Sequence, residues 1–160
     1  MLRLNLGCGR RKRDGWVNVD KSVRVEPDVV LDVTVTPWPW DAGSVDEAES
    51  FHLVEHMEAP RGEGFVNECF RVLRPGGRLV VECPDLAAVC ALYATDPARA
   101  TLSLFGHQNR GQAMRHRYGY SRETLAALLT RAGFRVEHVG DGTDYHAAEE
   151  PCIRVEAVKP

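Results

Sequence analysis

Short apolar segments recur along the chain and predict the strands of a β-sheet. Each segment spans five to seven residues and is bounded by turn-forming Gly, Pro, Asp or Asn, a pattern typical of buried strands. The predicted strands are residues 2–6, 16–20, 29–33, 45–51, 78–83, 135–139 and 152–158. The last two alternate apolar and polar residues around the polar loop 140–150, so they predict a hairpin that forms an antiparallel edge.

Apolar residues at helical spacing predict helices between the later strands. The predicted helices are residues 64–73, 86–93, 97–104 and a fourth that Ser121 caps and Gly133 ends. Residues 74–77, Arg-Pro-Gly-Gly, stop the first of them. Strands that alternate with helices predict an α/β fold with a mostly parallel sheet. At 160 residues the chain has room for one core, so we expect a single domain over residues 1–160.

The connection between the first two strands departs from this pattern. Residues 8–15 are polar and too few for a normal crossover helix. The sheet is therefore predicted to lack a helix at this point and to have one thinly covered face. We expect a homodimer to cover that face.

Composition and charge exclude several classes of protein. The net charge of −3 argues against wholesale nucleic-acid binding, although basic residues gather at positions 10–13 and 97–122. No apolar run approaches the roughly 20 residues that a membrane span needs, and Arg3 interrupts any secretory signal, so we expect a cytoplasmic protein. Five cysteines without a CxxC spacing predict buried free thiols.

The first two predicted strands carry the main candidate site. Gly7 and Gly9 lack a Cβ, so a ligand can approach the backbone closely and its N–H groups can face an anionic group. Asp20, at the tip of the second strand, offers an acceptor for ribose hydroxyls. A third glycine for a dinucleotide fingerprint is missing, because Lys12 stands in its place. The pattern indicates a nucleoside-binding edge.

Six motifs in order resemble the class I S-adenosylmethionine-dependent methyltransferases, in particular the small type 11 domains. The motifs are residues 5–9 (NLGCG), 15–20 (GWVNVD), 38–40 (WPW), 44–46 (SVD), 53–56 (LVEH) and 71–77 (RVLRPGG). The match covers about the first ninety residues and returns at residues 120–134. The resemblance implies a Rossmann-like, doubly wound sheet that lacks the family's usual first helix, and S-adenosylmethionine as cofactor.

Carried over position by position, the resemblance assigns the polar end of the cofactor first. It implies that Gly7, Cys8 and Gly9 hold its amino-acid end and that Asp20 holds its ribose.

The remaining cofactor contacts follow from the same resemblance. Asp32 would meet the adenine through its carboxylate and Val33 through its backbone. His52 would lie near the sulfonium and the acceptor. Of the indoles at Trp38 and Trp40, at least one is expected to pack against the core.

The segment from His52 to His56 also matches the H-x-x-E-H pattern of inverted zinc proteases. That chemistry needs both histidines on one helical face and a third ligand, whereas this motif follows a predicted strand. A simpler interpretation is that Glu55 and His56 cap the turn after the strand, so we expect no metal.

The segment 107–120 is predicted to bind the acceptor, because a loop after the fifth strand can fold over the carboxyl edge of the sheet as a lid. Its basic residues, Arg115 and His116 among them, favour an anionic acceptor, and Tyr118 and Tyr120 are placed to stack on a ring. The alternative is a basic loop without a role. His52 and His116 are the candidate bases, since histidine titrates near neutral pH.

The leading hypothesis is therefore an S-adenosylmethionine-dependent O- or N-methyltransferase for a small-molecule or glycan acceptor. A second hypothesis is a cofactor-binding domain without catalysis that serves as a partner subunit. RNA methylation is a third, based on the two basic stretches alone.

Overall fold

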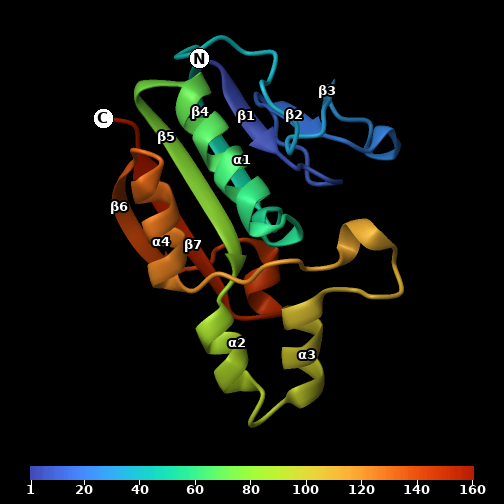
Figure 1. The fold of residues 1–160 in the computed structure, drawn as a ribbon. Coiled ribbons are helices and arrows are strands. Elements are labelled where there is room, and N and C mark those ends of the chain that lie inside the picture. The colour runs from blue at the N-terminus through green and yellow to red at the C-terminus, as the bar shows by residue number, and fades with distance from the viewer.

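The computed structural model describes all residues 1–160, and its centre is one seven-stranded sheet (Figure 1). The strand order across the sheet is β3-β2-β1-β4-β5-β7-β6. The strands are β1 (Arg3–Leu6), β2 (Val17–Asp20), β3 (Val29–Val30), β4 (Val45–Phe51), β5 (Leu73–Pro84), β6 (Arg135–Asp141) and β7 (Cys152–Val158).

Strands β1 to β5 are parallel, and β7 is antiparallel to both of its neighbours, β5 and β6. The Rossmann-like, mostly parallel sheet and the antiparallel C-terminal hairpin are thus confirmed. The carboxyl ends of the parallel strands meet at one edge, where the loops after β1, β2, β3 and β4 converge. The segment that follows α3 also reaches this edge (Figure 1).

The helices are α1 (Ala59–Val72), α2 (Leu86–Leu92), α3 (Pro97–Phe105) and α4 (Arg122–Arg131). Figure 1 shows α1 and α4 on the same face of the sheet, with α2 and α3 beyond the end of β5. The apolar stripes of α1 and α4 are buried in the core, as their spacing predicts. Ser121 caps α4 through a reciprocal bond with Thr124.

Three element boundaries differ from the sequence prediction. Helix α1 begins five residues before position 64, because Pro60 stands in its first turn, where its missing N–H costs nothing. Strand β5 begins directly at Leu73, since Gly76 N–H donates to Lys159 O and Gly77 O accepts from Lys159 N–H. Strand β3 has only two residues, because the Asp32 carboxylate accepts from Thr34 and turns the chain.

The connection between β1 and β2, residues 7–16, contains no helix, as predicted. Two buried side chains hold it instead. Asn5 Nδ2 donates to Arg11 O at 2.9 Å, and Asn18 Oδ1 accepts from Arg13 N–H at 2.7 Å. Asn5 and Asn18 also bond to each other at 2.9 Å. An amide pair on the sheet therefore replaces the packing that a helix would provide.

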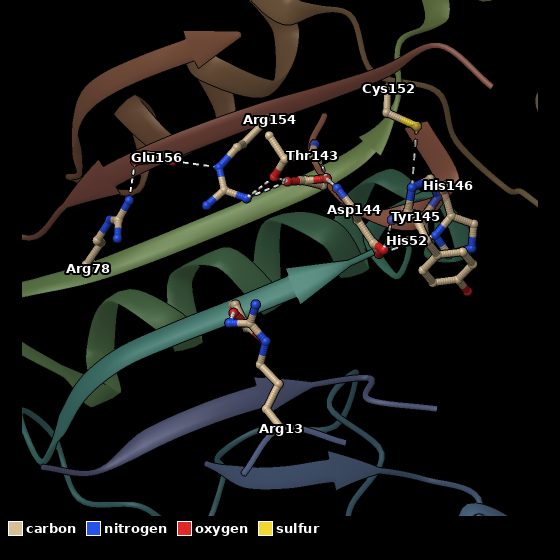
Figure 2. A network of polar contacts seen from close by, with 12 residues as sticks. Arg13, His52, Arg78, Thr143, Asp144, Tyr145, His146, Cys152, Arg154 and Glu156 are labelled. Carbon is tan, nitrogen blue, oxygen red and sulfur yellow. Dashed lines mark hydrogen bonds and ion pairs between the residues drawn. The ribbon is translucent and has the colours of Figure 1, made fainter. Parts of the chain in front are cut away.

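The face of the sheet away from α1 carries charged side chains where a helix would normally pack (Figure 2). Arg13 Nη1 lies 2.5 Å from Glu49 Oε2. Further along this face, Arg78 pairs with Glu156, and Arg154 pairs with Glu156 and with the buried Glu82. The charges neutralise one another across strands, which lets the face remain uncovered by helices.

Two further predictions concern the whole chain. All five cysteines are free, and all but the exposed Cys90 are buried. None of the helices combines the length and the apolar character that a membrane span requires.

Candidate functional site

The turn after β1 has the backbone geometry that its glycines predict. Gly7 and Gly9 have φ of 71° and 50°, the left-handed region that residues with a Cβ rarely adopt. A Cβ on Gly7 would lie 2.8 Å from the Leu53 side chain, whereas one on Gly9 would meet nothing within 4 Å. Gly7 is thus needed for packing, and only Gly9 faces open space.

The N–H groups of this turn are not free, which corrects the expectation that they face an anionic group. Gly7 and Cys8 both donate to Val19 O, at 2.8 and 3.0 Å. Gly9 donates to Asp20 Oδ2 at 2.9 Å. The turn is therefore hydrogen-bonded to β2. It leaves space for a ligand at Gly9, but the N–H groups of Gly7, Cys8 and Gly9 are already engaged.

Asp20 lies beside the glycine turn, as predicted for a ribose acceptor. Its Oδ2 accepts from Gly9 N–H and its Oδ1 from Ser22 N–H at 2.8 Å. The side chain is half-buried. A carboxylate oxygen has two lone pairs, so each oxygen retains one for a ribose hydroxyl.

Asp32 and Val33 follow β3 at the same edge. The Val33 carbonyl accepts from Trp38 Nε1 at 3.1 Å, but the Val33 N–H donates to no group in the chain. Burial by itself would raise the pKa of Asp32, but the hydrogen bonds from Thr34 hold it below its usual value. An ionised carboxylate and a free N–H therefore stand side by side. Trp38 itself is buried in the core, as expected for one of the two indoles.

A cavity of about 380 Å³ opens at this edge, between the loops after β2 and β3 and the segment after α3. Its lining residues are Lys21, Asp32, Thr34, His56, Met57, Glu58, Arg61, Gln112, Ala113 and Arg117. Gly7, Cys8, Gly9 and Asp20 do not line it. Sequence reasoning missed Lys21 and Arg61, although Lys21 directly follows Asp20.

His52 is held in a polar cluster at the end of β4 (Figure 2). Its Nε2 lies 3.5 Å from Cys152 Sγ, and its Nδ1 lies 3.2 Å from Glu55 Oε1. Burial alone would lower the pKa of His52, but the contacts with Cys152 and Glu55 raise it to about 10. At neutral pH the imidazole is therefore protonated and has no lone pair with which to accept a proton.

Aromatic residues from the loop between β6 and β7 stack above His52, and sequence reasoning missed them. The His146 ring lies 3.7 Å from the His52 ring, and Tyr145 lies 3.8 Å from His146. Arg11, from the loop after β1, covers Tyr145 at 4.1 Å. This column runs from His52, at the end of β4, to Arg11, in the helix-free connection between β1 and β2.

A second polar group lies beside the cavity. His56 Nδ1 contacts Arg115 O at 3.0 Å, and His116 Nδ1 contacts Ser103 O at 2.8 Å. The two rings meet edge to face at 4.9 Å. Glu55, in the 3₁₀ turn Val54–His56, is buried beside them. The turn follows a strand, as predicted, so His52 and His56 do not share a helical face.

None of the four residues predicted to bind the acceptor, Arg115, His116, Tyr118 and Tyr120, lines the cavity. Tyr120 is buried in the core, so it packs there and does not stack on an acceptor, which corrects that prediction. Tyr118 is exposed, with its ring 4.9 Å from Tyr120. Arg115 does not line the cavity, whereas Arg117 does. The segment is fastened to the sheet edge, because Arg117 and Tyr118 N–H both donate to Glu55 O.

Comparison with known proteins indicates which family this chain resembles. Residues 14–81 match the sequence model of a family described as a methyltransferase domain. A probable S-adenosylmethionine-dependent methyltransferase of Mycolicibacterium smegmatis is 35% identical over 100 residues, which is 62% of this chain and 32% of that protein. The chain thus spans about a third of the length of this curated relative.

Solved structures match the fold over nearly the whole chain. An S-adenosylmethionine-dependent methyltransferase of Methanosarcina mazei superposes with a TM-score of 0.71 at 17% identity, covering 98% of this chain and 91% of the other. The 1,6-didemethyltoxoflavin-N1-methyltransferase of Burkholderia thailandensis, solved with 1,6-didemethyltoxoflavin and S-adenosylhomocysteine, gives 0.64 at 17% identity, covering 99% and 70%. At these identities the structures establish a shared fold.

Proposed function

We propose that the chain is a class I S-adenosylmethionine-dependent methyltransferase domain, which binds S-adenosylmethionine and transfers its methyl group to a small-molecule or glycan acceptor. The match of residues 14–81 to the methyltransferase family, the similarity to the mycobacterial relative and the shared fold support this proposal. One observation carries the proposal. The ends of adjacent strands β2 and β3 place the carboxylates of Asp20 and Asp32 and the free N–H of Val33 at the edge where the cavity opens.

Each part of the cofactor has a matching group at this edge. Adenine presents a ring nitrogen that accepts and an amino group that donates, which suits the Val33 N–H and the Asp32 carboxylate. The ribose hydroxyls suit the remaining lone pairs of Asp20. The amino-acid end would lie over Gly9, where the backbone faces open space, and below the column of Arg11, Tyr145 and His146.

The cavity supports an acceptor that carries negative charge. Lys21, Arg61 and Arg117 bring three cationic side chains to its wall, against the carboxylates of Asp32 and Glu58. Arg117 is partly engaged by Glu58 at 3.4 Å, while Lys21 and Arg61 have no ion-pair partner in the chain. An acidic small molecule or an acidic glycan fits this charge.

The sulfonium donor is already activated, so the reaction needs mainly the alignment of the acceptor atom with the methyl group. An oxygen or nitrogen acceptor that must lose a proton needs a base as well. Of the two predicted candidates, His116 has its Nε2 free while its Nδ1 is bonded to Ser103 O. His52 is protonated at neutral pH, so it suits a fixed cation near the site better than a base.

The second hypothesis, a cofactor-binding partner subunit without catalysis, keeps one supporting observation. The connection between β1 and β2 contains no helix, so the amino-acid end of the proposed cofactor site is bounded by loops alone: the loop between β6 and β7, and Arg11 from the connection itself. A site built in this way can bind the cofactor without holding an acceptor in line.

Titration of S-adenosylhomocysteine by calorimetry tests the cofactor site. We expect micromolar binding by the wild-type chain and a loss of about tenfold to a hundredfold in Asp20→Ala, the effect of removing hydrogen bonds to a charged group. Asp14→Ala removes an exposed carboxylate from the same stretch and is the matched control. Binding in Asp20→Ala equal to that of the control would remove the assignment of Asp20.

A transfer assay with labelled S-adenosylmethionine then tests the acceptor. We expect methylation of an acidic small molecule or glycan, weakened in Arg117→Gln through a higher KM. Cofactor binding without transfer to any acceptor class would support the partner-subunit hypothesis. Transfer to RNA, with an affinity that falls steeply with salt, would support the third hypothesis.

A further inference from the structure

Glu55, His56 and His116 form a cluster whose features do not follow from cofactor binding. One ligand atom from each side chain, a carboxylate oxygen or a ring nitrogen, lies within 4.8 Å of the other two. Glu55 and His56 come from the turn after β4, and His116 comes from the segment after α3. The hydrogen bonds from Arg117 and Tyr118 N–H to Glu55 O hold these two segments together.

The two imidazoles are oriented in the same way. A backbone carbonyl only accepts hydrogen bonds, so His56 Nδ1 donates to Arg115 O and His116 Nδ1 donates to Ser103 O. In the neutral ring the lone pair is therefore on Nε2 in both residues. Metal-binding histidines are typically fixed in this way, with the second nitrogen bonded to a carbonyl or carboxylate.

The carboxylate of Glu55 lacks the partners that a buried charge requires. Its side chain is 2% exposed, and neither oxygen accepts a hydrogen bond from the chain. His52 Nδ1 lies 3.2 Å from Oε1, outside hydrogen-bond geometry, so it offsets the charge without satisfying the lone pairs. Burial of an unsatisfied carboxylate is costly, and buried charges are usually paired or bound to a metal.

We propose that Glu55, His56 and His116 bind a divalent transition-metal ion through one carboxylate oxygen and two imidazole Nε2 atoms. Two imidazoles and a carboxylate suit Zn²⁺, Co²⁺, Mn²⁺ or Fe²⁺ better than they suit Ca²⁺ or Mg²⁺. Three protein ligands leave at least one coordination position open, as in catalytic metal sites. Because the ligand atoms lie within 4.8 Å of one another, binding of one ion requires the three side chains to move closer together.

The open coordination position of the proposed metal would lie toward the cavity. His56 lines the 380 Å³ cavity beside Arg61 and Arg117. A ligand in that cavity that carries an oxygen or nitrogen atom can therefore complete the coordination. The metal site goes beyond the proposed methyl transfer and does not depend on it, because its ligands come only from the cluster. When the metal is bound, His116 Nε2 is a ligand and does not act as the base for the acceptor.

His52, Glu150 and Cys152 form a rival cluster, with their ligand atoms also within 4.8 Å. There both ring nitrogens of the histidine are engaged: Nε2 contacts Cys152 Sγ, and Nδ1 lies beside the carboxylates of Glu55 and Glu150. No ring lone pair is free for a metal. The geometry therefore favours the cluster of Glu55, His56 and His116.

Titration with Co²⁺ tests the site, because protein-bound Co²⁺ has visible absorption bands whereas Zn²⁺ is silent. We expect the metal-free wild-type chain to bind one equivalent and Zn²⁺ to displace it. We expect Glu55→Gln and His116→Ala to lose the bands, with Glu55→Gln retaining the shape of the side chain. His138→Ala, which removes an exposed imidazole from β6, is the matched control and should keep them.

A thermal melt gives a second readout that needs no catalysis. Saturating Zn²⁺ should raise the Tm of the wild-type chain and of His138→Ala, and leave that of folded His116→Ala unchanged. Failure of the folded wild-type chain to bind Co²⁺ or Zn²⁺ would overturn the proposal. So would bands that survive in His116→Ala but disappear in Cys152→Ser, since that result places the metal in the rival cluster.

Discussion

At the scale of single residues, Glu49 shows how a missing helix changes the chemistry of one side chain. It lies on β4 on the uncovered face, with its side chain 4% exposed and its Oε1 without a hydrogen-bond partner. Burial raises the pKa of Glu49 to about 7, and the neighbouring Arg13 offsets this only in part. Its proton is therefore held more tightly in the folded chain than in the unfolded chain.

This shift predicts a pH dependence of stability. Because the folded pKa is raised, the stabilisation is fully present below the ordinary value of 4.5 and is lost as the pH rises through about 7. Glu49→Gln keeps the shape and cannot titrate, so its unfolding free energy should gain about 3 kcal/mol on wild type between pH 4.5 and pH 8.

Urea denaturation at the two pH values measures this difference. Glu137→Gln, at an exposed site on β6, is the control and should parallel wild type. A difference between Glu49→Gln and wild type that stays constant with pH would show that Glu49 titrates normally.

At the scale of elements, the connection between β1 and β2 shows how a chain forms a parallel crossover without a helix. Asn18 accepts from Asn5 and Arg13 and donates to Asp28 at 2.8 Å, all from a side chain that is buried on β2. The connection stays in place because the amide satisfies backbone groups that a helix would satisfy internally. The glycine turn is held by the same strand, through Val19 and Asp20.

Asn18→Ala should therefore destabilise the chain by about 2 to 3 kcal/mol, since it leaves several buried donors and acceptors without partners. Asn109→Ala, in the exposed loop after α3, should change the unfolding free energy by less than about 0.5 kcal/mol. Chemical denaturation of both variants measures the contrast. Equal stabilities would mean that the amide network contributes nothing to the crossover.

At the scale of the whole molecule, the uncovered sheet face is the surface on which we expect a second copy of the chain to dock. Its arginines and glutamates alternate across strands, and Arg13 and Arg154 lie over Phe51 at 5.7 and 5.8 Å. A patch with both signs of charge is self-complementary, as the interface of a two-fold dimer requires. The homodimer expected from the sequence remains a prediction, now of a polar interface.

Light scattering after size exclusion tests the dimer. We expect twice the chain mass of 17.8 kDa at low ionic strength and dissociation as salt increases, because ion pairs at a polar interface are screened. Arg78→Glu should promote dissociation by placing like charges beside Glu47 and Glu156. A mass of one chain at every salt and protein concentration would contradict the dimer.

The sequence by itself determined the strands, the missing first crossover helix, the cap at Ser121 and the glycine turn beside Asp20. These features follow from local patterns, since periodicity, capping and backbone freedom involve residues close together in the chain. The strand predicted over residues 29–33 also puts Asp32 and Val33 toward the carboxyl edge of the sheet, because parallel strands share one carboxyl end. Their contact with the cofactor comes from the family resemblance and remains a prediction.

Only the tertiary structure decided which of these groups are free to act. It fastened the N–H groups of the glycine turn to β2, buried Tyr120 in the core and placed Cys152 against His52. It also brought His116 to Glu55 and lined the cavity with Lys21 and Arg61. The physical reason is that burial, protonation and hydrogen-bond partners depend on contacts between distant segments, which no local pattern specifies.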